Sequence, residues 1–230
     1  MRQIALDIGL DHGPSLSNFL AGPNQAALAH LRLWLMPSTN ASAVPRSPVP
    51  TYLWGPEGSG KTHLLRAAQR ALQEQGLAVG WLDAQTAGAP EFSEHWSALL
   101  MDDVHLYNAS QQQWAFNWFV NAQTHQRAVL AAGRVAPAEL LLRDDLRTRL
   151  GWGHLFALEV LSEEGRRAVL REAAIARGLV LGEEVMDFML TRFSRDLGSL
   201  MHLLDLLDGY CLQTQRGITI PLIKSMLDNA

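Results

Sequence analysis

The 230-residue chain is 48% hydrophobic and 18% charged, a composition that suits one or two compact domains and excludes a disordered or fibrous protein. Its net charge of −4 and its pI near 6.0 argue against a broad nucleic-acid-binding surface, which is normally basic. The lone Cys211 cannot form an internal disulfide, no apolar run approaches the ~20 residues that span a bilayer, and the amino terminus is a poor signal peptide. We therefore expect a cytoplasmic protein with no role for a membrane.

The first ten residues alternate in character, with apolar side chains at positions 4, 6, 8 and 10. This period of two indicates extended chain with one apolar face. Two interpretations remain open from the pattern alone. The segment is either an edge strand of its own domain, which the periodicity favours, or a peptide that docks into an apolar pocket of a partner.

A helix is predicted next, from Asn24, a residue type that commonly caps helices, to about Met36. The proline-rich segment from Pro37 to Pro50 is predicted to be a loop. Thr51 to Trp54 then has the character of a short buried strand, and His63 to Gln75 carries apolar residues at helical spacing.

Between that strand and that helix lies a complete G-x-x-x-x-G-K-[ST] pattern, which indicates a phosphate-binding loop in this context. Its glycines let backbone N–H groups approach phosphate oxygens. Lys61 is expected to reach the β and γ phosphates of ADP or ATP, and the Thr62 hydroxyl to bind Mg²⁺. The residues expected to contact the nucleotide are Gly55, Pro56, Glu57, Gly58, Ser59, Gly60, Lys61, Thr62 and His63.

A second strand is predicted at Leu77 to Asp83, and a third from Ser97 that ends in Asp102 and Asp103. An apolar strand followed by carboxylates is the Walker B arrangement. This pattern is a weak indication of function alone but a strong one downstream of a full phosphate loop. It predicts Asp102 near the Mg²⁺ ion and Asp103 near the water that would attack the γ phosphate.

The helix predicted at Ser110 to Gln123 carries four aromatic residues at helical spacing, which favours core packing over base stacking. A fourth strand is predicted at Ala128 to Ala132, an arginine-rich helix at Leu140 to Leu150, and a fifth strand at Leu155 to Glu159. A run of arginines is by itself usually a solvated face.

From Ser162 the sequence predicts helices only, at about 162–178, 183–193, 194–211 and 219–227, with Cys211 in a core stripe. The eight histidines form no metal-binding pattern. We therefore expect an amino-terminal tail over 1–14, an α/β nucleotide-binding domain with a five-stranded parallel sheet over 15–160, and a small all-helical lid domain over 161–230.

This layout resembles the AAA+ class of P-loop NTPases and, within it, the DnaA-like replication ATPases. The resemblance rests on residues 19–24, on 100–103, on Arg147-Thr148-Arg149-Leu150-Gly151-Trp152-Gly153 and on 194–197, and it covers nearly all of the chain from residue 15. DnaA's long amino-terminal region and its carboxy-terminal DNA-binding domain have no match here. Instead, Gln3-Ile4-Ala5-Leu6-Asp7-Ile8 is similar to sliding-clamp-binding peptides, and residues 218–224 are similar to the carboxy terminus of the Hda group, the regulatory inactivators of DnaA.

The resemblance implies a negative regulator of replication initiation that binds the DNA-loaded sliding clamp of DNA polymerase III through Gln3, Ile4, Leu6 and Ile8. It would promote hydrolysis of ATP bound to DnaA, and it would reach DNA only through its partners. Arg149 matches an arginine finger that acts in trans, and Arg195 matches the second sensor, which contacts the nucleotide from the lid. ADP or ATP as the working ligand, a share for Arg147 in the finger role and assembly into a homo-oligomer stay open.

Two departures from the family pattern concern hydrolysis. DnaA-like proteins carry a Ser-Asp pair where this chain has Ala132 and Gly133 before Arg134, so a water-orienting group is missing. Asp103 stands where many AAA+ proteins have Glu, although DnaA shares the Asp. We therefore expect tight nucleotide binding with slow or no hydrolysis by the chain alone. The alternatives are a helicase-loader-type ATPase driven by its own hydrolysis, and a passive adaptor that binds clamp and ADP.

Overall fold

The computed structural model describes residues 13–19, 21–36, 47–88, 91–192, 197–214 and 218–228. They form two compact units, one from Gly13 to Val160 and one that starts at Leu161. The predicted clamp-binding residues Gln3, Ile4, Leu6 and Ile8 and the predicted second sensor Arg195 lie outside the described residues. Within the described ranges, no helix is both long and apolar enough to cross a membrane.

A five-stranded sheet forms the centre of the first unit, in the order β2-β3-β4-β1-β5. Every neighbouring pair is parallel, which confirms the predicted α/β fold and brings all the carboxyl ends of the strands to one edge. Helices cover both faces, so β4 is buried along its whole length. The strands are β1 Thr51–Trp54, β2 Ala78–Leu82, β3 Trp96–Met101, β4 Ala128–Gly133 and β5 His154–Ala157.

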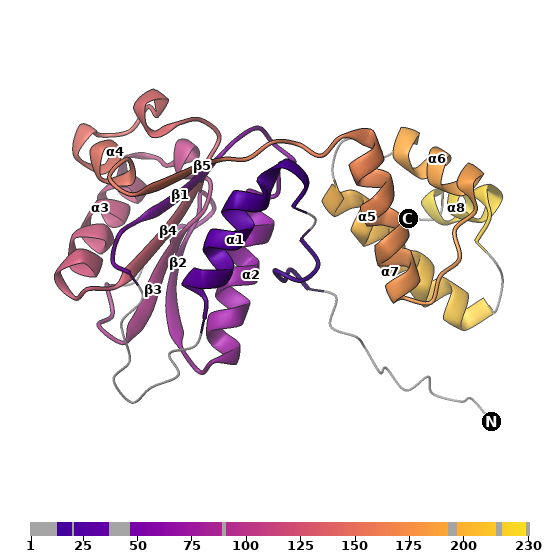
Figure 1. The fold of residues 1–230 in the computed structure, drawn as a ribbon, viewed down its shortest axis with the longest axis horizontal. Coiled ribbons are helices and arrows are strands. Elements are labelled where there is room, and N and C mark those ends of the chain that lie inside the picture. The colour runs from indigo at the N-terminus through magenta and orange to yellow at the C-terminus, as the bar shows by residue number, and fades with distance from the viewer. Residues whose placement is uncertain are drawn as a thin grey trace. The chain divides into compact units, whose positions relative to one another are not determined.

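Helices α1 and α2 lie on one face of this sheet, and α3 and α4 lie on the other (Figure 1). The first pair, α1 Gln25–Trp34 and α2 Lys61–Glu74, buries a core that includes Leu31, Leu64 and Leu130. The second pair, α3 Ala109–Thr124 and α4 Asp144–Leu150, buries a core that includes Leu99, Phe119 and Leu146. Short 3-10 turns at Gly22–Asn24, Val104–Leu106 and Pro137–Glu139 connect these elements.

The structure corrects the expected start of the arginine-rich helix. The segment predicted to be helical from Leu140 becomes a helix only at Asp144. Leu140 and Leu142 are buried while Leu141 is 96% exposed, a period of two that belongs to extended chain. Three successive leucines fit either period, and burial of the first and third against the second core decides between them.

Asn24 has a different role from the predicted helix cap. It stands at the N-cap of α1 but makes no capping hydrogen bond. Its buried side chain instead donates to the Glu159 carbonyl at 2.9 Å and accepts from the Glu159 N–H at 2.8 Å. Asn24 therefore joins the start of α1 to the chain that leaves β5.

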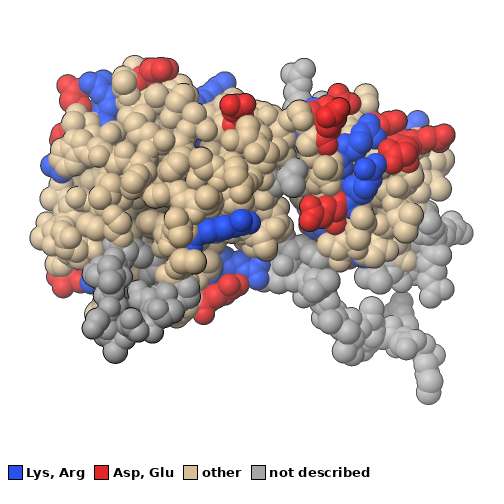
Figure 2. Space-filling view, in the orientation of Figure 1, with Lys and Arg blue, Asp and Glu red and all other residues tan. Residues whose placement is uncertain are grey.

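The second unit is all helical, with a core that includes Leu170, Met189, Leu204 and Ile223. Ser162 caps its first helix by accepting from the Gly165 N–H at 3.1 Å, as predicted. On the face in Figure 2, positive and negative side chains lie side by side over this unit, and pairs such as Arg177 with Asp205 are close enough to form salt bridges. Its helices are α5 Glu163–Ala176, α6 Glu183–Arg192, α7 Leu197–Thr214 and α8 Ile220–Asp228.

Candidate nucleotide-binding site

The predicted phosphate loop leaves the carboxyl end of β1 and enters α2 at Lys61. Gly55, Gly58 and Gly60 all have positive φ values, of 155°, 76° and 91°. A side chain would also clash, because a Cβ on Gly55 would stand 2.2 Å from the Leu158 carbonyl oxygen and one on Gly60 would stand 2.6 Å from the Phe19 ring. The glycines therefore permit both the backbone path and the close packing around the loop.

Lys61 is buried at the start of α2, and its ammonium group holds the loop together. Its Nζ donates to the carbonyl oxygens of Gly55 at 2.8 Å and Pro56 at 2.7 Å, and to the Ser59 hydroxyl at 3.2 Å. Burial lowers the pKa of Lys61, and the negative charge of Asp103 opposes that effect. The first backbone N–H groups of α2 have no partner within the helix, so they are suited to bind an anion.

Thr62 and Asp102 come from different elements and meet at the carboxyl edge of the sheet. The Thr62 hydroxyl lies near the Asp102 carboxylate and stabilises its charged form. Burial raises the pKa of Asp102, the Thr62 hydroxyl opposes this, and the neighbouring charge of Asp103 adds to the rise. One hydroxyl and one carboxylate fit Mg²⁺, which prefers oxygen ligands and takes the remainder from phosphate and water. Among the described residues no cluster of three His, Cys, Asp or Glu competes for a metal.

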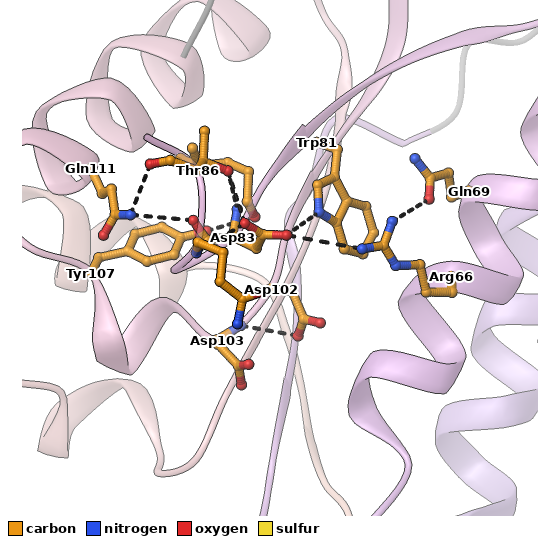
Figure 3. Close-up of polar contacts among 11 residues, drawn as sticks. Arg66, Gln69, Trp81, Asp83, Thr86, Asp102, Asp103, Tyr107 and Gln111 are labelled. Carbon is orange, nitrogen blue, oxygen red and sulfur yellow. Dashed lines mark hydrogen bonds and ion pairs between the residues drawn. The ribbon is translucent and has the colours of Figure 1, made fainter. Parts of the chain in front are cut away.

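Asp103 has a left-handed backbone, with φ 49° and ψ 40°. Asp tolerates this conformation better than most residues, and its N–H donates to Asp102 Oδ1 at 3.0 Å. The two carboxylates consequently point in different directions (Figure 3). The charge of Asp103 acts on Lys61 and His105, which is compatible with its predicted place beside the γ phosphate.

A polar network beside Asp102 was not anticipated from the sequence (Figure 3). Arg66 lies on α2 one turn after Thr62, with its guanidinium carbon 3.6 Å from the centre of a Trp81 ring and 3.9 Å separating Nη2 from Asp83 Oδ2. Its positive charge opposes the rise in the pKa of Asp102. The i to i+4 spacing from Thr62 is the sequence signal that could have identified it.

The chain before α1 packs over the phosphate loop. Phe19 contacts Gly60, as the 2.6 Å approach described above requires, and its ring centre lies 5.6 Å from that of His63. The His63 Nε2 is 3.1 Å from the Ser15 carbonyl oxygen. Burial lowers the pKa of His63, and the contact with Ser15 opposes this. The imidazole of His63 is thus held by this segment. The group of His63 that could bind a phosphate is therefore its own backbone N–H.

Gly133, at the end of β4, stands at one of the two positions where the family pattern has a polar residue. Gly133 accepts a hydrogen bond from the Gly55 N–H at 3.3 Å, so β4 is joined directly to the phosphate loop. A Cβ at this position would stand 2.2 Å from the hydroxyl oxygen of Tyr52. That hydroxyl is buried and donates to the Val135 carbonyl at 2.9 Å. A larger residue at 133 would have to displace Tyr52.

The predicted arginine finger, Arg149, lies in the last turn of α4. The Arg149 guanidinium carbon is 5.0 Å from a Trp152 ring centre and 5.5 Å from the Phe116 ring centre. Trp152 is 59% exposed. Phe116 was expected in the second core but lies beside the Arg149 guanidinium instead. Trp114, Trp118 and Phe119 do pack in that core, as predicted. A cavity of about 360 Å³ opens beside Arg149, lined also by Asp144, Asp145, Thr148 and Trp152.

The three arginines of this region differ in their partners. Arg143 Nε is 2.6 Å from Asp145 Oδ1, and Arg147 Nη2 is 2.7 Å from Asp144 Oδ1. Across the described ranges, Arg149 has no carboxylate within ion-pair distance. Among the described residues, no carboxylate therefore occupies the N–H donors of the Arg149 guanidinium.

Comparisons with known proteins agree with this architecture. The family described as "Hda, lid domain" matches residues 163–227. Domain III of the replication initiation protein DnaA from Thermotoga maritima is similar in structure, with TM-score 0.70 and 22% identity over 94% of this chain and 95% of that one.

Two longer proteins are also similar. AMPPCP-bound DnaA from Aquifex aeolicus matches with TM-score 0.65 and 24% identity over 86% of this chain and 66% of that one. A DNA replication initiation factor matches with TM-score 0.66 and 22% identity over 84% of this chain. The match spans only 64% of that factor's length.

Proposed function

We propose that this chain, whose residues 163–227 match the Hda lid family and whose fold is similar to that of DnaA domain III, is a nucleotide-bound negative regulator of chromosomal replication initiation. In this role it binds ADP or ATP with Mg²⁺ in the loop from Gly55 to Thr62, and it supplies Arg149 in trans to ATP bound by DnaA. The loop geometry and the similarity to an AMPPCP-bound DnaA support the nucleotide site.

Binding at the chain's own site follows from the groups described above. Lys61 holds the loop in shape, the amino end of α2 receives the phosphates, and Thr62 with Asp102 holds the Mg²⁺ ion, which neutralises phosphate charge. Hydrolysis by the chain itself is slow, because Ala132 and Gly133 offer no polar side chain to orient water. The nucleotide then serves as a long-lived structural ligand.

The observation that carries the regulatory role is the guanidinium of Arg149. Contacts with two aromatic rings restrict its motion without occupying its N–H donors, and each such contact contributes about 0.5 to 1 kcal/mol at an exposed site. A guanidinium held in this way can neutralise charge that develops on a γ phosphate. Arginine fingers contribute about 10³ to 10⁵ in rate.

The amino-terminal peptide supplies the location. Gln3, Ile4, Leu6 and Ile8 bind the sliding clamp of DNA polymerase III, which places the regulator in the cytoplasm on replicated DNA without a DNA contact of its own. DnaA is the protein partner, and a homo-oligomer is not required by this scheme.

The test is hydrolysis of DnaA-bound ATP in the presence of DNA-loaded clamp, with the intact chain or with a Gln3→Ala, Leu6→Ala variant. The intact chain should stimulate hydrolysis and the variant should not, whereas Asp7→Ala, a change outside the four predicted clamp-binding residues, should behave as the intact chain. Stimulation by neither form, combined with turnover by the chain alone that rises with single-stranded DNA, would instead indicate a helicase-loader-type ATPase. Stimulation by neither and no such turnover would indicate a passive adaptor.

A further inference from the structure

The carboxylate of Asp145, in the first turn of α4, has a partner at both of its oxygens. Arg143, the residue before α4, donates from Nε to Asp145 Oδ1 at 2.6 Å and from Nη2 to Asp145 Oδ2 at 2.8 Å. Asp145 Oδ1 also accepts from the Leu146 N–H at 2.8 Å. Two parallel hydrogen bonds from one guanidinium to one carboxylate are the strongest form of this contact, so Arg143 occupies Asp145.

The spacing along α4 would otherwise make Asp145 the partner of Arg149. The two residues are four positions apart with the acid nearer the amino end, and on a helix this arrangement favours an ion pair. Both residues also line the cavity of about 360 Å³. Among the described residues, however, Arg149 lies within ion-pair distance of no carboxylate. The contact from Arg143 accounts for this difference.

Arg143 also supports the aromatic ring beside Arg149. Its guanidinium carbon is 4.5 Å from the centre of the Phe116 ring, and that of Arg149 is 5.5 Å from the same centre. Arg143 donates as well to the side chain of Gln113, which lies on α3 with Phe116. Asp145 balances the charge of Arg143, so two guanidinium groups can lie near one ring with little repulsion.

We propose that Arg143 is a positioning residue for Arg149. By occupying the Asp145 carboxylate it prevents an ion pair within α4, and the Arg149 guanidinium stays available to the phosphates of another molecule. The inference rests on the proposed finger role of Arg149. It explains how a finger remains unpaired although two carboxylates, those of Asp144 and Asp145, line the same cavity.

The first measurement uses the full chain alone, by NMR of its arginine side chains. The Arg149 Nε–H signal is assigned by its loss in Arg149→Lys. Arg143→Gln should free Asp145 to bind Arg149, so the exchange of that hydrogen with water should slow about fivefold, the equivalent of an ion pair of about 1 kcal/mol. A second change, Asp145→Asn, should restore the original exchange because an amide carries no charge. An unchanged Arg149 signal in Arg143→Gln would overturn the inference, whatever the chain does to DnaA.

The second measurement is the maximal rate at which DnaA-bound ATP is hydrolysed with DNA-loaded clamp and saturating regulator. Arg143→Gln should lower this rate about fivefold, and the double variant Arg143→Gln, Asp145→Asn should recover it. A merely structural role for Arg143 predicts no recovery, because the second change removes a further contact. Arg143→Lys keeps a cation beside Asp145 and should resemble the intact chain. Equally low rates in Arg143→Gln and the double variant would contradict the proposal, whereas no stimulation by the intact chain would contradict the finger role itself.

Arg147→Gln is the matched control on the same helix. Arg147 Nη2 lies 2.7 Å from Asp144 Oδ1, so this variant also frees one carboxylate. Asp144 is five positions from Arg149, a spacing that does not make the two side chains neighbours on a helix. The variant should change the Arg149 exchange and the maximal rate by less than about twofold. The same changes as in Arg143→Gln would show that any freed carboxylate has this effect, and would overturn the specific role of Arg143.

Discussion

The Tyr52 hydroxyl occupies the space that a side chain at Gly133 would need. The oxygen lies 2.2 Å from the ideal Cβ position, and its hydrogen bond to the Val135 carbonyl keeps it there. Tyr52 within β1 and Gly133 at the end of β4 are therefore matched to each other, beside a phosphate loop to which Gly133 is also hydrogen-bonded.

This match predicts coupling between the two positions. Gly133→Ala should cost about 1 to 3 kcal/mol because Tyr52 must move, and Tyr52→Phe should cost about 1 kcal/mol for the lost hydrogen bond. The double variant should be more stable than the sum of the two costs implies, by about 1 kcal/mol, because the hydroxyl that clashes is gone. Urea unfolding followed by tryptophan fluorescence measures this, since all seven tryptophans precede residue 160 and report on the α/β unit. Strict additivity would contradict the match.

The Asp102 carboxylate should lower the stability of the nucleotide-free protein and strengthen the binding of Mg²⁺. Burial raises the pKa of this carboxyl, so stability is lost as the pH rises from the ordinary value of that pKa through the raised one. Asp102→Asn removes the charge and keeps a side-chain oxygen of the same size near Thr62, so the nucleotide-free variant should unfold at a higher urea concentration at pH 7. The tightening of nucleotide binding by Mg²⁺ should fall by at least about tenfold. A less stable variant with an unchanged Mg²⁺ effect would contradict this assignment.

Asn24 should stabilise the α/β unit through its two hydrogen bonds with Glu159 and not as a helix cap. Asn24→Ala leaves the N–H and the carbonyl of Glu159 without their partner, at a cost of about 2 to 3 kcal/mol in the free energy of unfolding. Asn121→Ala is the control, because that half-buried side chain donates, among the described residues, to a carbonyl of its own helix alone. It should change stability by less than about 0.5 kcal/mol. Equal losses at both positions would show that the Glu159 contacts contribute little.

His30 should make the α/β unit sensitive to acid. Burial lowers the pKa of this imidazole, and so does the charge of His154, whose ring centre is 4.6 Å away; Thr51 and Phe156 are its other near neighbours. The unfolded chain therefore takes up this proton first, and stability that is present above pH 6.5 is lost as the pH falls below it. The urea midpoint should fall less between pH 7.5 and pH 5.5 in His30→Gln than in the intact chain or in a variant of exposed His95. An equal fall in all three would contradict the prediction.

The elements near the phosphate loop could be predicted from the sequence because their signals are local. The motif, the apolar strand before it and the helical spacing after it lie within 25 residues, and β1 has the predicted bounds. The role of Asn24 could not be predicted, because its partner Glu159 is 135 residues away. Phe116 fitted a core pattern like its neighbours, and only the approach of α4 to α3 sets it beside Arg143 and Arg149.

The finger assignment is also beyond what local pattern can decide, since Arg143, Arg147 and Arg149 are equivalent as a run of charges. Their ion pairs separate them. Arg147 is bound to Asp144 one helical turn away, whereas Arg149 contacts only aromatic rings among its described neighbours.

The central measurement is therefore the rate at which DnaA-bound ATP is hydrolysed with DNA-loaded clamp, in the presence of the intact chain, Arg149→Ala or Arg147→Ala. The account predicts that Arg149→Ala abolishes the stimulation, a loss of about 10³-fold or more where the full effect is measurable, while its binding to clamp and to nucleotide is unchanged. Arg147→Ala should keep most of the stimulation. Full stimulation by an Arg149→Ala protein that still binds its partners would contradict the account.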